Sequence, residues 1–386
     1  MKVLKPSILI ALAITLFTSC NNGMDNTSIG VDSNYSVYRL QKLIIATGAM
    51  GDEFKWEVTS ESGNTTLLSE DRECIFVAEE SGSYALKLTI KDGVEEISQT
   101  STIIVLPEDI EYKASMTKVL EFNPAPGQFI NDLPEYEEGD TKESIRQKTE
   151  EYLLNGNIIS LGSFGGYIIV GFDHTILNKE GKDIIIKGNA TTGSAEPGIV
   201  SVSIDKNNNG IADDEWYELA GSEYNNPETK KNYQVTYYRH DENKLPIMGE
   251  NGVINKEYIK WEDNMGNSGF IEQNNFTNHT PEYWPKWSNS NTITVSGTLL
   301  PKNYIIKSNG QYFLNKYEWG YADNHANRYI EDNSFDISWA VNRNGEKVNI
   351  KGIDFIKITT ALLQNCGQIG EASTEFAGAE DLNLTQ

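Results

Sequence analysis

Long apolar segments, cysteines and histidines are all scarce in this chain of 386 residues. The longest apolar run near its start, residues 8–17, is far shorter than the roughly 20 residues that a membrane-spanning helix needs. Three cysteines exclude a disulfide-dense scaffold. The four histidines are not closely paired, which gives a zinc site little support.

Positive charge is also in short supply. Lysine and arginine number 32 against 56 aspartates and glutamates, so the formal net charge is -24. A surface this acidic repels phosphate backbones and anionic headgroups, which makes nucleic acid a poor partner, and it attracts divalent cations. Any membrane attachment must therefore come from a lipid anchor rather than from surface charge.

Catalytic signatures are missing as well. The sequence contains no Gly-x-Ser-x-Gly, no His-Glu-x-x-His, no glycine-rich phosphate loop and no dinucleotide fingerprint. Adjacent acids such as Asp213 and Asp214 are common by chance in so acidic a chain. We therefore expect a binding protein rather than an enzyme. A buried carboxylate pair about 5–10 Å apart in a cleft would instead indicate a hydrolase.

The first twenty residues predict lipid attachment. Lys2 and Lys5 precede the apolar run, and Phe17-Thr18-Ser19 leads into Cys20, as in a lipobox. We expect a signal peptide over residues 1–19, acylation of Cys20 and a polar tether over 20–35. The alternative is an ordinary secretory signal in which Cys20 is incidental. We expect outer-membrane anchoring and cell-surface exposure, although the sequence leaves the choice of leaflet open.

Residues 36–107 predict a small β domain. Short alternating segments are separated by Gly, Asn and Ser, and Asp92-Gly93 marks a tight hairpin. Trp56 is expected in the core. This pattern, ending in the strand 103–105, resembles the PKD-like branch of immunoglobulin-type sandwiches.

Residues 108–118 are expected to be a linker, and residues 119–386 a larger β domain. One helix is predicted after residue 140, capped by Asp140 or Thr141 and closed by Gly156. The strand candidates are residues 166–172, 183–187, 198–204, 233–239, 292–299 and 354–360. The fold class is therefore all-β, with an Ig/PKD-like sandwich followed by a jelly-roll-like sandwich. Cys74 and Cys366 fall in different domains and are expected to be buried thiols.

An oxygen-rich loop over residues 205–215 predicts a structural Ca²⁺ site. Oxygen-bearing side chains recur at alternate positions, a glycine at 210 provides the sharp bend, and acids follow, which is how short extracellular loops surround calcium. Trp216 stands where an EF-hand has its bidentate glutamate, so the loop is not an EF-hand. The candidate ligands are Asp205, Asn207, Asn209, the Ile211 carbonyl, Asp213, Asp214 and Glu215. The alternative is a plain hairpin turn at Asn209-Gly210.

Two segments dense in aromatic rings, residues 279–288 and 317–328, predict a ligand site. Flat rings beside amides, carboxylates and a guanidinium suit the faces of sugars or corrinoids. The alternative is that the rings belong to the core. The candidate ligand-binding residues are Tyr283, Trp284, Trp287, Trp319, Tyr321, Asp323, Asn324 and Arg328.

Six motifs together resemble a family of surface lipoproteins from gut Bacteroidetes. They are residues 123–129, 160–173, 196–200, 216–221, 319–324 and 370–375. The resemblance covers roughly residues 36–384 and implies a PKD-like domain followed by a large β-sandwich. It also implies an accessory of TonB-dependent uptake, with cobalamin acquisition favoured.

These observations leave three functions open. The first is capture of a small nutrient, cobalamin favoured, for a TonB-dependent transporter. The second is glycan binding through the tryptophans, and the third is a cell-surface adhesin or structural module.

Overall fold

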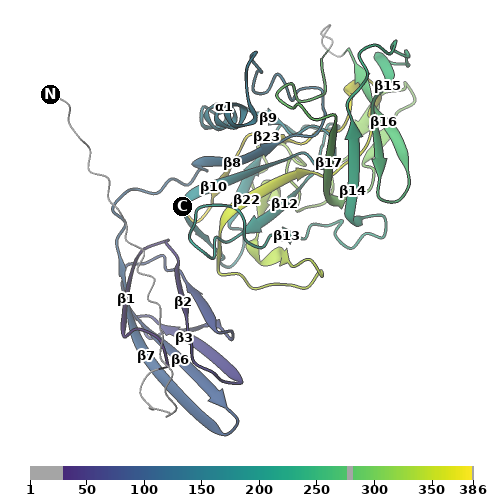
Figure 1. The fold of residues 1–386 in the computed structure, drawn as a ribbon. Coiled ribbons are helices and arrows are strands. Elements are labelled where there is room, and N and C mark those ends of the chain that lie inside the picture. Colours follow the sequence, from purple (N-terminus) through teal and green to yellow (C-terminus); the bar gives the residue numbers. More distant parts are fainter. Residues whose placement is uncertain (1–28, 276–280, 385–386) are drawn as a thin grey trace, which may run out of the picture.

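A computed structural model describes residues 29–275 and 281–384. The signal segment, Cys20 and most of the tether lie outside these residues. The chain folds into a small body and a large body, joined by a single segment that runs from the end of β7 to the start of β8 (Figure 1). No helix among the described residues has both the length and the apolar character needed to cross a bilayer.

The small body is a two-sheet sandwich. Its five-stranded sheet has the order β1-β7-β6-β3-β4, and β2 pairs with β5 in the second sheet. The strands are β1 (Asn34–Tyr38), β2 (Leu43–Ala46), β3 (Glu53–Thr59), β4 (Thr65–Ser69), β5 (Glu73–Phe76), β6 (Gly82–Asp92) and β7 (Glu95–Leu106). Trp56 is fully buried between the sheets, and Gly93 takes φ 57° in the predicted hairpin turn.

The centre of the large body is a six-stranded antiparallel sheet with the order β21-β13-β12-β22-β10-β8. Its strands are β8 (Lys118–Asn123), β10 (Tyr167–Leu177), β12 (Gly198–Ser203), β13 (Tyr217–Leu219), β21 (Ala340–Val341) and β22 (Gly352–Thr360). Alternate residues point to opposite faces of a strand. One face carries Val200, Val202, Ile356 and Ile358 into the main hydrophobic core.

Smaller sheets flank this centre. The core is covered by a three-stranded sheet of β11 (Ile184–Lys187), β20 (Ser334–Phe335) and β24 (Gly378–Asp381). A four-stranded sheet contains β14 (Lys230–Tyr238), β15 (Val253–Asp263), β16 (Ser268–Asn274) and β17 (Thr292–Leu299). A hairpin is formed by β18 (Tyr304–Ile306) and β19 (Tyr312–Leu314), and a long-range antiparallel pair by β9 (Ile159–Ser160) and β23 (Glu375–Phe376).

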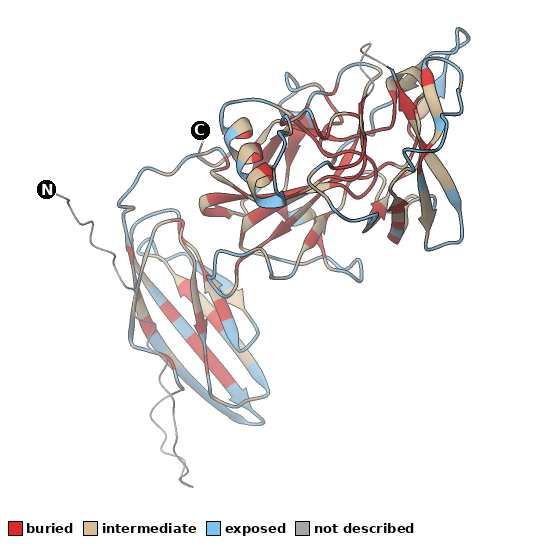
Figure 2. Ribbon diagram, turned by 45° about the horizontal axis from the view of Figure 1, so that its top comes forward, coloured by how far each residue is buried: buried red, intermediate tan, exposed pale blue. Residues whose placement is uncertain are grey.

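The one α-helix of the described residues, α1 (Lys142–Leu154), begins as expected. Thr141 is the N-cap and forms a reciprocal capping box with Ser144, which satisfies two N–H groups of the first turn. Ile145, Thr149 and Leu153 form its buried face, which Figure 2 shows as a red stripe. Three short 3-10 turns span Glu331–Asn333, Ile337–Trp339 and Gly367–Ile369. The all-β class with one short helix is confirmed.

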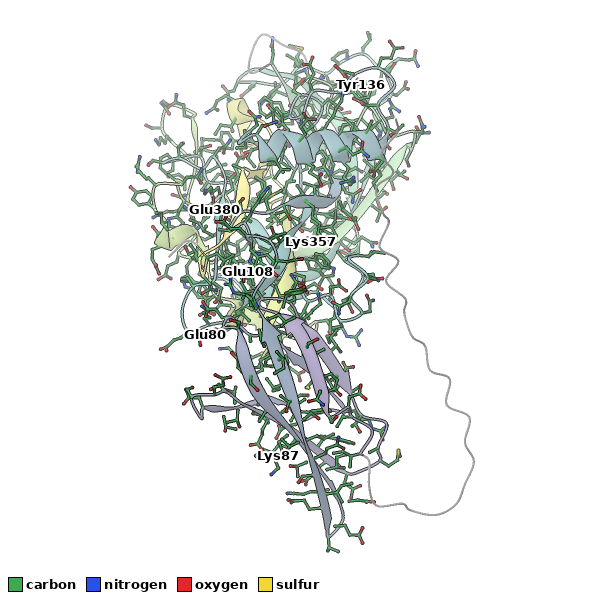
Figure 3. All side chains as sticks on the ribbon, turned by 90° about the vertical axis from the view of Figure 1, so that its left-hand side faces the viewer. Glu80, Lys87, Glu108, Tyr136, Lys357 and Glu380 are labelled. Atoms are coloured by element: carbon green, nitrogen blue, oxygen red, sulfur yellow. The ribbon has the colours of Figure 1, made fainter. Side chains whose placement is uncertain are left out.

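Backbone and ionic contacts join the two bodies. The Thr175 N–H donates to the Leu40 carbonyl at 2.8 Å, and the Lys179 ammonium lies 2.6 Å from Glu79. Figure 3 shows Glu80 at the end of the small body that faces the large one, and Glu108 in the connecting segment. Cys74 and Cys366 are buried free thiols, one in each body, as expected.

Candidate functional site

A groove of about 530 Å³ lies on the face of the six-stranded sheet that is turned away from the main core. Its floor is formed by Ile199 and Ser201 of β12 and by Lys357 and Thr359 of β22, the alternates of the core residues. The walls come from β13, β14, β17 and the turn after β21. The wall residues are Trp216, Glu218, Tyr224, Lys231, Asn232, Ser296, Gly297, Thr298 and Val341 to Gly345.

Two aromatic rings stand in the walls. Trp216 directly precedes β13 and is half-buried, and Tyr224 sits in the turn that begins at Gly221, whose carbonyl accepts from the Tyr224 N–H at 3.0 Å. The Lys231 ammonium lies 3.3 Å from the centre of the Tyr224 ring and 3.1 Å from Glu218. This cation–π contact and ion pair hold the ring in place.

The opposite wall is a tight turn. Oδ1 of Asn342 accepts from the Asn344 and Glu346 N–H groups at 2.9 and 3.0 Å, which fixes the turn and leaves Arg343 exposed. Gly345 has φ 81°, and a Cβ there would lie 3.1 Å from the Tyr224 hydroxyl. Glycine therefore permits both the conformation and the close approach of the turn to Tyr224.

The groove carries more positive than negative charge, although the chain as a whole is strongly acidic. Lys231 is paired with Glu218, whereas no ion pair is formed by Arg343 or Lys357 among the described residues. The Lys357 ammonium lies 4.0 Å from the Tyr167 ring centre, and burial lowers the pKa of this lysine, opposed by the charge of Glu121. Figure 3 labels Lys357 within the large body.

The structure brings the first part of the 205–215 loop together. Asp205 accepts from the Asn209 and Gly210 N–H groups at 3.1 and 2.9 Å, and the Asn209 amide donates to Asp213 at 3.1 Å. Asn207 also reaches Asp213, at 3.4 Å. Four of the expected oxygen-bearing side chains, those of Asp205, Asn207, Asn209 and Asp213, thus converge on one side of the loop.

Two other candidate ligands turn elsewhere. Asp214 accepts from the Lys206 N–H at 3.0 Å, and Glu215 accepts from the Tyr217 hydroxyl at 3.0 Å. Ile211 donates its N–H to the Asn209 side chain at 2.7 Å. The donor set that meets is therefore narrower than the sequence pattern suggested. It consists of hard oxygen atoms, which fits calcium.

The expectation that residues 279–288 present rings to solvent is wrong for two of them. Tyr283 and Trp284 are 0 % exposed and belong to the core of the four-stranded sheet. The Trp284 indole N–H donates to the Ser290 carbonyl at 3.1 Å, and Asn131 donates to the Trp284 carbonyl at 3.0 Å. Because these bonds satisfy its polar groups, the segment can fold inward. Trp287 is partly buried against the main core.

The second aromatic segment is also largely internal. Tyr321 is buried, with its hydroxyl accepting from the Glu223 N–H at 2.8 Å, and Asn324 closes the turn through two bonds to Tyr317. Asp323 is buried among backbone N–H groups. Tyr321 and Asp323 are unavailable to a surface ligand, which corrects the expectation, and the amide of Asn324 is taken up by its bonds to Tyr317.

Two of the predicted ligand-binding residues in that segment do reach solvent. Trp319 is 37 % exposed and packs 4.6 Å from the Trp339 ring, and Arg328 is exposed beside Tyr329. A second hollow of about 410 Å³ nearby is lined by Asn324 together with His325 and Tyr329. None of the predicted aromatic residues lines the larger groove.

The groove residues could not be grouped from the sequence because they come from five separate stretches of chain, residues 199–201, 216–232, 296–298, 341–345 and 357–359. In the sequence, Trp216 stands out as a departure from the EF-hand pattern. A tryptophan directly before a short strand is also a sign of a ring beside a binding groove. The other sign in the sequence is the run Asn342-Arg343-Asn344-Gly345, which is typical of a tight turn and places an arginine at its tip. The pairing of β22 with β12, β12 with β13 and β13 with β21 brings most of these stretches together.

No protein-family model matches the chain, and no curated protein matches it. Among solved structures, the SusE-like protein BT2857 is 10% identical, with 91% of this chain and 95% of that chain covered and a TM-score of 0.27. A structure titled as the basis for promiscuous specificity of carbohydrate-binding modules from the β-sandwich superfamily is also 10% identical, with coverages of 92% and 97% and a TM-score of 0.17. At these TM-scores the similarities establish no shared fold.

Proposed function

We propose that this chain is a lipid-anchored surface protein that binds a saccharide in the groove between β13, β22 and the 342–345 turn. The observation that carries the proposal is a pair of rings, Trp216 and Tyr224, beside amide and charged side chains in one open groove. Aromatic faces cover the apolar faces of sugar rings, and polar neighbours accept and donate hydrogen bonds to their hydroxyls. The volume is within the range of small-molecule sites.

The charges of the groove favour a saccharide that carries carboxylate or sulfate groups. Once Lys231 and Glu218 compensate each other, Arg343 and Lys357 remain as the unpaired charges. A guanidinium binds a carboxylate through two parallel hydrogen bonds, which adds specificity to attraction. The acidic remainder of the surface would keep such a ligand away from other sites.

A saccharide thus replaces cobalamin as the favoured ligand. Cobalamin was favoured by resemblance alone, and no residue of the groove is specific for a corrinoid. The lipid anchor at Cys20, the outer-membrane location and hand-over to a TonB-dependent transporter remain parts of the proposal that rest on the sequence.

We also propose that the 205–215 loop binds Ca²⁺ through Asp205, Asn207, Asn209 and Asp213. An ion there would replace the amide–carboxylate bonds that now hold these side chains together. Because Trp216 follows the loop directly, an ordered loop would fix the position of one groove ring.

The proposal is tested by calorimetric titration of the full chain, purified in detergent, with acidic and neutral oligosaccharides and with cobalamin. We expect binding of an acidic oligosaccharide and a loss of at least tenfold in affinity for Trp216→Ala. Trp319→Ala, which removes an exposed tryptophan outside the groove, is the matched control and should bind normally. Heat from cobalamin alone, or equal losses in both variants, would overturn the proposal.

A further inference from the structure

Three carboxylates meet in the interior of the large body. Oxygen atoms of Glu196, Asp323 and Glu375 all lie within 4.8 Å of one another, and all three side chains are buried. They come from the segment before β12, from the turn after residue 317 and from β23. None of them lines either of the two hollows described above.

Backbone N–H groups hold these side chains in place. Asp323 accepts from the Asn189 and Ala190 N–H groups, both at 2.7 Å, and from the Glu375 N–H at 3.0 Å. Glu196 accepts from the Ser373 N–H at 2.9 Å. Such bonds orient the carboxylates toward one another, but they do not neutralise three adjacent charges.

No positive side chain neutralises the cluster. Within residues 29–275 and 281–384, no lysine, arginine or histidine forms an ion pair with any of the three acids. Burial, together with the charges of Asp323 and Glu371, raises the pKa of Glu196 to about 8, and burial raises the pKa of Asp323 to about 7. Burial and the charges of Glu196, Asp323 and Glu371 raise the pKa of Glu375 well above its ordinary value.

A fourth acid adds an independent observation. Glu371 is 4 % exposed; its Oε1 accepts from the Gln128 N–H at 2.6 Å, but its Oε2 has no hydrogen-bond partner. The charge of Glu371 acts on both Glu196 and Glu375. A buried carboxyl with one unpartnered oxygen, close enough to act on two members of the cluster, is a group that a bound cation would satisfy.

We propose that Glu196, Asp323 and Glu375 bind one buried Ca²⁺ ion, with the Glu371 carboxyl as a further negative charge near the site. The donors are all carboxylate oxygens, which suit a hard cation, and no histidine or thiolate joins the cluster to favour zinc. Two oxygens that share a Ca²⁺ at ~2.3–2.6 Å are at most about 5 Å apart, as these are. The ion ties three segments that are far apart in sequence into one core.

The test separates this site from the 205–215 loop. The full chain, purified in detergent and carrying Asp213→Asn, is dialysed against micromolar Ca²⁺, and bound metal is measured by elemental mass spectrometry. We expect one ion per chain, and none once Glu375→Gln is added. Chelation should lower Tm by several degrees in the first protein and leave the second unchanged.

If the three acids share protons and bind no metal, the experiment gives the opposite result. Replacing one of three repelling carboxylates would then raise Tm, with and without chelator, and no ion would be retained by either protein. Glu196→Gln is a second variant with the same predictions, in case Glu375→Gln fails to fold. Retention of metal by the double variants would also overturn the proposal.

Discussion

The Lys42 ammonium lies 3.1 Å from Oδ2 of Asp354, a contact between the small body and the central strand of the large one. Oδ2 of Asp205, the first residue of the 205–215 loop, is 3.8 Å from the same ammonium. The Asp205 N–H donates to Asp354 at 2.8 Å. One buried lysine therefore connects the small body to both the sheet and the loop.

We predict that Lys42→Met loosens the contact between the two bodies. The Lys42 side chain is 7% exposed and that of Asp354 13%, so the change leaves two aspartates facing each other in a dry site, at a cost of about 3–5 kcal/mol. Small-angle scattering should show a larger radius of gyration, and the urea midpoint should fall. Lys55→Met, which breaks an exposed pair with Glu57, is the control and should change little.

His174 predicts a pH dependence of stability. Burial acts to lower its pKa, but hydrogen bonds to Asp381 at 2.9 Å and Asp173 at 2.8 Å outweigh this, and the native pKa is raised above 6.5. A base with a raised native pKa stabilises the fold fully below its unfolded pKa, and this contribution is lost as pH rises through the native value. The free energy of unfolding should therefore fall as the pH rises above 6.5.

Two histidine variants check the assignment. His174→Gln should remove the slope above pH 6.5 in urea denaturation. The pKa of His240 is lowered, chiefly by burial, so this residue titrates below that range. His240→Gln should leave the slope unchanged, and an equal slope in both variants would contradict the role of His174.

The burial of Trp284 predicts a stability effect without a binding effect. Trp284→Ala empties a fully buried site and should destabilise the chain by about 3–5 kcal/mol. Trp319→Ala removes a ring that is partly exposed and should cost about 1 kcal/mol. Thermal unfolding of both variants measures the difference, and similar shifts in Tm would contradict the burial of Trp284.

Calcium should stabilise the loop through Asp213. In a Glu375→Gln background, which leaves the buried cluster out, 10 mM Ca²⁺ should stabilise the chain by about 1.5–2.7 kcal/mol for a site of 10⁻⁴ to 10⁻³ M affinity. Asp213→Asn should abolish this gain. Asp214→Asn should retain it, because Asp214 accepts from Lys206 instead of facing the asparagines. A gain that survives Asp213→Asn would place the ion elsewhere.

Local patterns predicted the helix and many of the strands, but no strand candidate fell on β15 or β16. The Thr141 cap, the Ile145/Thr149/Leu153 face and the strands around residues 198–203 and 352–360 depend on near neighbours, which a sequence displays directly. The prediction that Trp56 lies in the core is confirmed, because apolar and polar residues alternate along its strand and the apolar ones mark the side that faces the core.

The site was harder because its position depends on contacts between distant segments. A proline-containing segment with two tryptophans suggested an exposed loop, but Asn131, some 150 residues away, satisfies its backbone and draws it inward. Trp216 and Arg343 share a groove because β13 and β21, the strands beside them, are neighbours in the sheet. Composition cannot show such pairings.

The position of β22 between β12 and β10 has a consequence for biosynthesis. Both neighbours are synthesised about 150 residues or more before β22. They form no hydrogen-bonded ladder with each other, so they pair only when the strand that separates them has been made. Closure of this long-range sheet is a late, slow event. Nascent chains that end before residue 352 should therefore stay open, a state that chaperones can hold and a translocation channel can accept.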